Sequence, residues 1–476
     1  MSIMAVIETA GKVLPSALRA RLSPLLARLV PILQGRDEIA LAQRMALVAF
    51  AIRIISAAIA FASQIIQARL MGEFEYGIFV FVWVLVILAG NLSCLGFHST
   101  VIRFLPQYKA RFENAEIRGL TWTARVFAML SASLLASIGV VWLHFFGASV
   151  HDYYLVPVFL GLFALPMIAL GDVLDGTARA NSWPVSALSP TYIIRPLLIL
   201  SFMLAALWLF DLPPTATTAM QAALAATYVT TLGQFLAVTW RLRRHYQRGP
   251  HTINFAAWFR VAIPIFLIEG FGFLLTNSDV VVVGLYLPPE QVAIYFAAAK
   301  TMALVQFVFF SVKAAAAPRF SGMMAERDMR ALATFAGQTA RWSFWPSLTV
   351  GLAVLAIGEP MLALFGNAFT AGYVLMAILF AGMMAKALIG PGEVLLSMAG
   401  KQNLCVLVYA AALTANIGLN ITLIPLLGLK GAALAAALAM MVEAILLHLA
   451  VRNALGIVMF AFANPLAILN KPAKVA

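Results

Sequence analysis

The sequence predicts an all-α polytopic membrane protein with about 12 transmembrane helices, arranged as two six-helix lobes that form a parallel internal repeat. Two observations predict this fold class. Hydrophobic residues make up 63% of the 476 residues and charged residues only 11%, and the apolar runs are about 20 residues or longer. This composition excludes a soluble globular chain. The continuous runs disfavour a β-barrel, whose strands alternate over segments of about ten residues.

The predicted spans follow one another with short connections. They cover about 42–68, 76–98, 123–146, 154–175, 189–210, 216–240, 258–286, 291–315, 335–357, 371–397, 403–425 and 431–451. The predicted organisation has five parts: a basic cytoplasmic segment that we expect to be amphipathic (1–38), an N-terminal six-helix lobe (39–240), a basic cytoplasmic linker (241–256), a C-terminal six-helix lobe (257–456) and a tail (457–476).

Basic residues are distributed unevenly between the connections. After odd-numbered spans they are chiefly Arg69 and Lys430. After even-numbered spans they are Arg103, Lys109, Arg111, Arg118, Arg179, Arg241, Arg243, Arg244, Arg248, Arg319, Arg327, Arg330 and Lys401. Because basic loops stay on the cytoplasmic side, we expect both termini there. Orientation and contact with anionic membrane lipid explain the formal charge of +13 more simply than a nucleic-acid partner does.

The strongest architectural signal is internal repetition. A shift of 216 residues aligns Tyr76–Phe79 with Val292–Tyr295, and Arg103 with Arg319, in matching positions relative to their spans. Each repeat holds six spans, an even number, so both halves enter the membrane in the same orientation. Parallel repeats of this kind are typical of transporters, with the substrate site between the halves.

The first long apolar run, Met45–Leu70, contains Arg53 about a third of the way along. A guanidinium at that depth costs about 2.5–3.5 kcal/mol on insertion scales, so it should face protein or a wet cavity. At helical spacing from it lies a small and polar stripe of Ser56, Ala60, Ser63 or Gln64, and Gln67. This stripe is either a helix–helix seam or a cavity-lining face, and its recurrence in the seventh span favours the cavity.

Four charged residues lie well inside predicted spans: Arg53, Glu269, Lys300 and Lys386. Three cations against one carboxylate predict a positive cavity, which suits a diphosphate or another acidic head group. The alternative for each is a structural ion pair. Arg195, followed by Pro196, either lines the same cavity or reaches the interface. We therefore assign the candidate substrate-binding residues as Arg53, Lys300, Lys386 and Arg195.

Glu269 and Asp279 are the candidates for ion coupling or gating. The repeat places Glu269 at the position of Arg53, so we expect these two side chains to form a switchable pair between the lobes. Asn416 and Asn420 share one helical face and form either a cavity wall for sugar or an interhelical hydrogen-bonded seam. Asp172 and Glu393 precede the basic residues Arg179 and Lys401 at matched places, which predicts that each carboxylate pairs with the adjoining loop.

No catalytic motif is present: the sequence has no Walker loop, no HExxH and no supported Ser/His/Asp grouping. The two cysteines, Cys94 and Cys405, give neither a disulfide framework nor zinc-ligand spacing. We therefore expect no catalytic residue, no metal site and no cofactor.

Several segments resemble a known family. They are ARLMGEFEYGIF with GFHSTVIRFLPQY, SDVVVVGLYLPPEQVAIYFAAAK with APRFSGMMAERD, LFGNAFTAGY, and NIGLNITLIPLLGLKGAALAAAL. Over residues 40–456 the chain is similar to the polysaccharide-exporter branch of the multidrug/oligosaccharidyl-lipid/polysaccharide exporter superfamily, the Wzx-like O-antigen and exopolysaccharide flippases.

The resemblance implies a V-shaped, two-lobed flippase in the bacterial cytoplasmic (inner) membrane. Its substrate would be an undecaprenyl-diphosphate-linked oligosaccharide for O-antigen, exopolysaccharide or capsule synthesis, moved by alternating access with a proton or sodium gradient. Polysaccharide polymerase and glycosyltransferase machinery are the implied protein partners. The alternatives are a multidrug exporter of the same superfamily and, from a different class, a membrane O-antigen polymerase or ligase enzyme.

Overall fold

The computed structural model describes residues 38–246, 249–326 and 328–463, and no β-strand occurs in these ranges. Most of the predicted N-terminal segment and most of the predicted tail lie outside the described residues. The α-helices are α3 (Glu38–Ser93), α4 (Phe97–Ala110), α5 (Asn114–Phe146), α6 (Asp152–Ala180), α7 (Pro184–Ser189), α8 (Arg195–Leu209), α9 (Ala216–His245), α10 (Phe255–Tyr286), α11 (Pro289–Met302), α12 (Gln306–Glu326), α13 (Met329–Ala356), α14 (Gly358–Ala363), α15 (Tyr373–Ile389), α16 (Gly392–Met398), α17 (Gln402–Leu427) and α18 (Leu429–Leu455).

The helices account for the twelve predicted crossings. Ten helical segments in the described chain are long and apolar enough to span a membrane. The first of them, α3, turns back at Gly72, whose φ of 74° is not helical, and therefore crosses twice. The less apolar α13, with 28 residues, supplies the remaining crossing. The chain is thus a multi-pass helical membrane protein.

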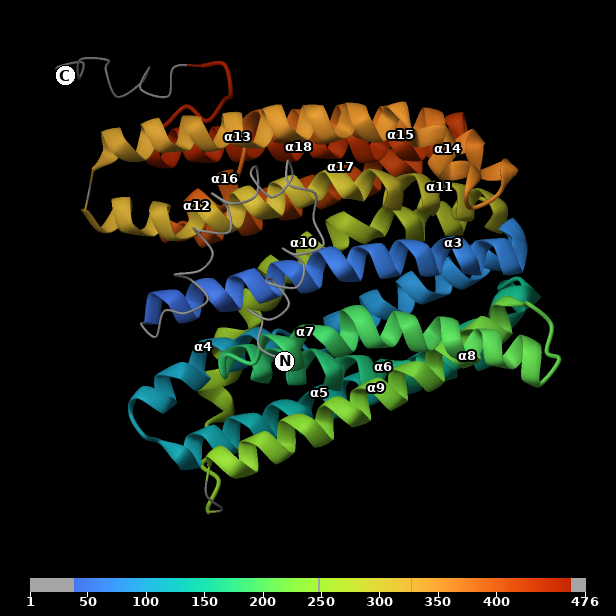
Figure 1. Ribbon diagram of the computed structural model, residues 1–476, viewed down its shortest axis with the longest axis horizontal. Helices are drawn as coiled ribbons and strands as arrows, with labels where there is room; N and C mark the ends of the chain where they lie inside the picture. The colour runs from blue at the N-terminus through green and yellow to red at the C-terminus, as the bar shows by residue number, and fades with distance from the viewer. Residues whose placement is uncertain (1–37, 247–248, 327, 464–476) are drawn as a thin grey trace, which may run out of the picture.

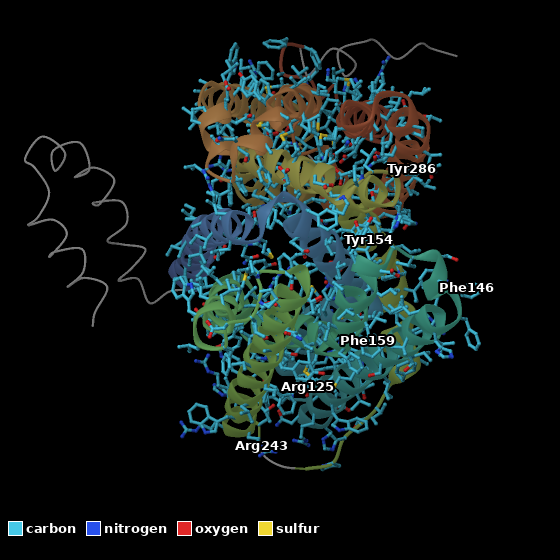
Figure 2. All side chains as sticks on the ribbon, turned by 90° about the vertical axis from the view of Figure 1, so that its right-hand side faces the viewer. Arg125, Phe146, Tyr154, Phe159, Arg243 and Tyr286 are labelled. Atoms are coloured by element: carbon cyan, nitrogen blue, oxygen red, sulfur yellow. The ribbon has the colours of Figure 1, made fainter. Side chains whose placement is uncertain are left out.

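The crossings form two lobes, with α3 along the boundary between them (Figure 1). We call α3 to α9 the first lobe and α10 to α18 the second lobe. In the end-on view of Figure 2 the second lobe occupies the upper half and the first lobe the lower half, where Arg125 and Arg243 lie. We call the two ends of the bundle the Gly72 end, where α3 turns, and the linker end, where α9 connects to α10.

The lobes are joined most closely at the Gly72 end. Here the Phe61 ring meets Phe365 with centroids 5.5 Å apart, and the Tyr76 ring meets Phe369 at 6.2 Å. Arg69 of α3 donates from Nε to the carbonyl oxygen of Leu364, just after α14, at 2.6 Å. The largest hydrophobic cluster contains residues of both lobes. Two smaller clusters toward the linker end each belong to one lobe, which gives a V-shaped arrangement joined at the Gly72 end.

Helix α10 crosses from one lobe to the other. Near its start Phe255 packs on Phe97 of α4 and Phe127 of α5, with ring centroids 5.8 and 5.4 Å apart. It also packs along α17 of the second lobe. Pro264 lies inside the helix between its start and its centre, where it removes one backbone hydrogen bond. A movement of the lobes therefore has to be accommodated by α10.

Candidate functional site

Two cavities, each of about 300 Å³, lie on either side of the Phe296 side chain, which lines both. The second-lobe cavity is enclosed by α10, α11, α12, α15, α17 and α18. The first-lobe cavity lies between α3, α6 and the segment that leads into α8, and Phe273 of α10 also contributes to its wall. The candidate site is therefore divided between the lobes, with α10 and α11 forming the partition.

Three lysines line the second-lobe cavity: Lys300, Lys313 and Lys386. The Lys386 amine lies 2.6 Å from Glu443 Oε1, and Lys313 forms an ion pair with Glu393. The Lys300 amine lies 5.1 Å from the centroid of the Phe296 ring. Among the described residues, no carboxylate lies within salt-bridge distance of Lys300. Lys300 is thus the cavity lysine best placed to meet an incoming anion.

Asp279 of α10 also lines this cavity and is 9% exposed. It accepts hydrogen bonds from the hydroxyl of Tyr295, at 2.6 Å, and from the backbone N–H of Val280, at 3.1 Å. These neutral donors stabilise a carboxylate without cancelling its charge. Asp279 therefore gives the cavity a negative group beside the lysines.

The charge of the second-lobe cavity differs from the expected excess of cations. Asp279 and Glu443 line it, and Glu393 pairs with one of its lysines, so three carboxylates accompany three lysines. The difference arises because Glu443 of α18 lines the cavity and Glu393 of α16 pairs with Lys313, and the sequence does not identify either of these contacts between distant helices. The predicted pairing of Glu393 with Lys401 is wrong for the same reason, since its partner is Lys313.

The polar stripe of α3 faces the first-lobe cavity, as predicted: Ala60, Ser63, Gln64 and Gln67 line it. Arg195 and Asp172 also line this cavity. Asp172 accepts a hydrogen bond from Asn91 Nδ2 at 3.1 Å, whereas Arg179, its predicted partner, pairs with Asp175 instead. Arg195 is 5% exposed and directly follows a π-helical segment, Pro190–Ile194. It therefore lines the cavity rather than reaching the interface.

The expected pair of Arg53 and Glu269 is not formed in this structure. The Arg53 guanidinium lies over the ring of Tyr192, 4.6 Å from its centroid, and Tyr192 lines the first-lobe cavity. Glu269 reaches the first lobe at a different place. Its carboxylate lies 2.9 Å from His98 Nε2 and accepts hydrogen bonds from the Ser99 hydroxyl at 2.8 and 2.9 Å. Glu269 therefore links α10 to α4 between the lobes.

Asn416 and Asn420 have different positions. Both are buried on α17, but only Asn416 is among the residues that line the second-lobe cavity. Asn420 donates from Nδ2 to the backbone carbonyl oxygen of Asn416 at 2.9 Å. Asn416 thus belongs to the cavity wall, whereas Asn420 makes its hydrogen bond inside the helix bundle.

Sequence reasoning assigns no role to three further residues that line the second-lobe cavity, Gln306, Lys313 and Glu443. Lys313 lies near the end of a predicted span, where a lysine is usually explained by the interface. Glu443 is a carboxylate inside an apolar run of the sequence, and this position is the one signal that indicates a role for it in the interior.

The comparisons with known proteins agree with this architecture. Residues 43–324, more than half of the chain, match the family described as polysaccharide biosynthesis protein. The fold is similar to an inward-facing multidrug resistance MATE family transporter of the MOP superfamily, with a TM-score of 0.70 and 14% identity over 84% of this chain and 94% of that chain. It is also similar to the lipid II flippase MurJ in an inward closed conformation, with a TM-score of 0.67 and 14% identity over 85% of this chain and 87% of that chain.

An outward-facing MATE family transporter of the same superfamily gives a TM-score of 0.57 at 15% identity, over 86% of this chain and 95% of that chain. No curated protein matches the sequence. At these identities the structural likeness establishes the fold of the MOP superfamily transporters.

Proposed function

Because this chain belongs to the polysaccharide biosynthesis protein family, we propose that it is a flippase that moves a polyprenyl-diphosphate-linked oligosaccharide across the bacterial cytoplasmic membrane. The product would serve the synthesis of O-antigen, exopolysaccharide or capsule. The similar fold of a lipid II flippase supports a lipid-linked substrate. The chain acts as a transporter and not as an enzyme.

One observation carries the proposal: Lys300 lines a cavity beside the partition between the lobes and has no carboxylate within salt-bridge distance among the described residues. A lysine amine is a compact donor that binds phosphate as a point charge. The diphosphate would contact Lys300 and Lys386, with Arg195 and Arg53 on the first-lobe side. The sugar would then face amide and hydroxyl groups such as those of Asn416 and Tyr409.

The charge of the loops supports an orientation of the chain in the membrane. The linker end holds the basic connections, including Arg241, Arg243 and Arg244, and is therefore the cytoplasmic end. The lobes are joined at the opposite, outer end, so the flippase is in an inward-facing state. Alternating access would separate the lobes at the Gly72 end and bring them together at the linker end.

Ion coupling completes the proposed cycle. Glu269 and Asp279 are carboxylates on α10, the helix that contacts both lobes. A proton or sodium ion that neutralises either one would change the contacts of α10, which is how an ion gradient could bias the two states. Neighbouring glycosyltransferases would supply the lipid-linked sugar on the cytoplasmic side, and a polymerase would use it on the outer side.

A multidrug exporter is the second candidate. The carboxylates Asp279 and Glu443 in the second-lobe cavity favour it, since they would attract cationic drugs. Deletion of the gene distinguishes the two functions when the leaflet location of lipid-linked oligosaccharide and the susceptibility to drugs are both measured. The flippase proposal predicts that lipid-linked oligosaccharide accumulates on the inner leaflet while drug susceptibility stays unchanged. Increased drug susceptibility with normal surface polysaccharide would support the exporter, and flipped but unpolymerised units on the outer leaflet would point to a polymerase or ligase.

A further inference from the structure

The ion pair between Lys313 and Glu393 lies at the wall of the second-lobe cavity, where Glu393 also interacts electrostatically with Lys386. Lys313 is on α12 and Glu393 is in the first turn of α16. The Lys313 side chain is 30% exposed and lines the cavity, whereas Glu393 is 12% exposed. Apolar residues of the same two helices, including Phe320 and Leu395, pack together behind the pair. The lysine is therefore held at the cavity wall by Glu393, with part of its side chain exposed.

Lys313 and Lys300 are well separated along one wall of the cavity. A short 3-10 segment, Ala303–Val305, joins α11 to α12 without a break, and Lys313 follows Lys300 by 13 residues. At 1.5 Å per residue this places the two residues about 20 Å apart along the helix axis. Lys313 lies on the side toward the linker end, where Arg319 and Arg330 follow. The two lysines are too far apart to hold the same phosphate.

We propose that Lys313 forms a second anion-binding site, at which the diphosphate of the substrate is held before it reaches Lys300. This inference rests on the proposed function and adds an entry site to it. An ammonium group has three N–H donors, so Lys313 can keep Glu393 as a partner while it donates to a phosphate oxygen. Glu393 fixes the position of the lysine and, by its negative charge, weakens the binding of the anion, so that the diphosphate can move on toward Lys300.

Equilibrium dialysis of the purified full-length protein with radiolabelled inorganic pyrophosphate tests the inference. We expect the wild type to bind two pyrophosphate ions per chain. The double variant Lys313→Met, Glu393→Gln should bind one, and Lys300→Met should bind one. The double variant removes both charges, so it leaves no buried carboxylate without its cation. Lys401→Met, which changes an exposed lysine outside the cavity, should still bind two.

The single variant Glu393→Gln provides a test of opposite sign. It keeps Lys313 and removes the competing carboxylate. The pyrophosphate ion at Lys313 should therefore bind roughly threefold to tenfold more tightly. The inference is overturned if the double variant still binds two ions, or if the wild type binds a single ion that is lost only with Lys300. That last result would leave the proposed function intact, whereas a wild type that binds no pyrophosphate would contradict the proposed function itself.

Discussion

Gly77 of α3 and Pro289 of α11 touch backbone to backbone at the Gly72 end of the bundle. A Cβ atom placed on Gly77 would lie 1.8 Å from the carbonyl oxygen of Pro289, which no side chain could tolerate without a shift of the backbone. The two lobes approach this closely only because residue 77 has no side chain. The contact between Gly77 and Pro289 therefore forms only in the state in which the lobes are joined at the Gly72 end.

We predict that Gly77→Ala disfavours the state with a closed Gly72 end, because the added methyl group forces α3 away from α11. The measurement is the rate at which a cysteine at Thr276, in the second-lobe cavity, reacts with an impermeant thiol reagent from each side of the membrane. Cys94 and Cys405 are replaced by alanine in the background. Gly77→Ala should increase labelling from the outer side. Gly233→Ala, where a Cβ would meet nothing within 4 Å, is the matched control and should label like the wild type.

A second prediction concerns the link between Glu269 and α4. In the inward-facing state a short bifunctional thiol reagent should join cysteines at Ser99 and Glu269, because their side chains are hydrogen-bonded. Cysteines at Arg53 and Glu269 should not be joined in the same state, since Arg53 lies over Tyr192. Efficient linking of the cysteines at Arg53 and Glu269 without added substrate would contradict this. It would show that Glu269 lies beside Arg53 in the resting state, as the repeat predicts.

The ion pair between Lys386 and Glu443 gives a third prediction. Lys386→Met leaves the Glu443 carboxylate, which is 5% exposed, buried without its cation, and should lower the free energy of unfolding in detergent by about 3 kcal/mol. Adding Glu443→Gln should restore most of that stability but not transport, because Lys386 is a proposed contact of the diphosphate. A double variant as unstable as Lys386→Met would mean that the unpaired carboxylate is not the cause.

The orientation of the chain gives a fourth prediction. A cysteine at Arg244, at the linker end, should react with an impermeant reagent only in inside-out membrane vesicles. A cysteine at Asp211, between α8 and α9, should react only from the outside of intact cells. Reversal of these two results would place the basic loops outside and would invert the proposed direction of transport.

The sequence predicts the crossings and the polar face of α3 because both depend on local patterns. Hydropathy locates each span, and helical spacing is enough to put Ser63 and Gln67 on the face that lines the first-lobe cavity. The partners of the buried charges depend instead on how distant helices pack. Lys313 meets Glu393 across 80 residues of sequence, and no periodicity within either helix encodes that contact.

Irregular turns explain other differences between sequence and structure. The π-helical segment before Arg195 changes the angle at which its side chain leaves the helix, so regular spacing gives no guide to the cavity that it enters. The repeat predicts a pair of Glu269 and Arg53 because the two positions are equivalent. The packing of α10 against α4 gives Glu269 closer partners, His98 and Ser99.

The central claim is that Lys300 receives the diphosphate of a lipid-linked oligosaccharide during its movement between leaflets. Its most direct test is a translocation assay in proteoliposomes that contain the full-length protein and an undecaprenyl-diphosphate-linked oligosaccharide. A membrane-impermeant glycosidase then measures the exposed fraction of the sugar over time. We predict that wild type and Lys401→Met translocate the lipid at equal rates and that Lys300→Met, reconstituted to the same amount, is at least about tenfold slower, as expected when one charged contact is lost. Equal rates for Lys300→Met and wild type would contradict the account.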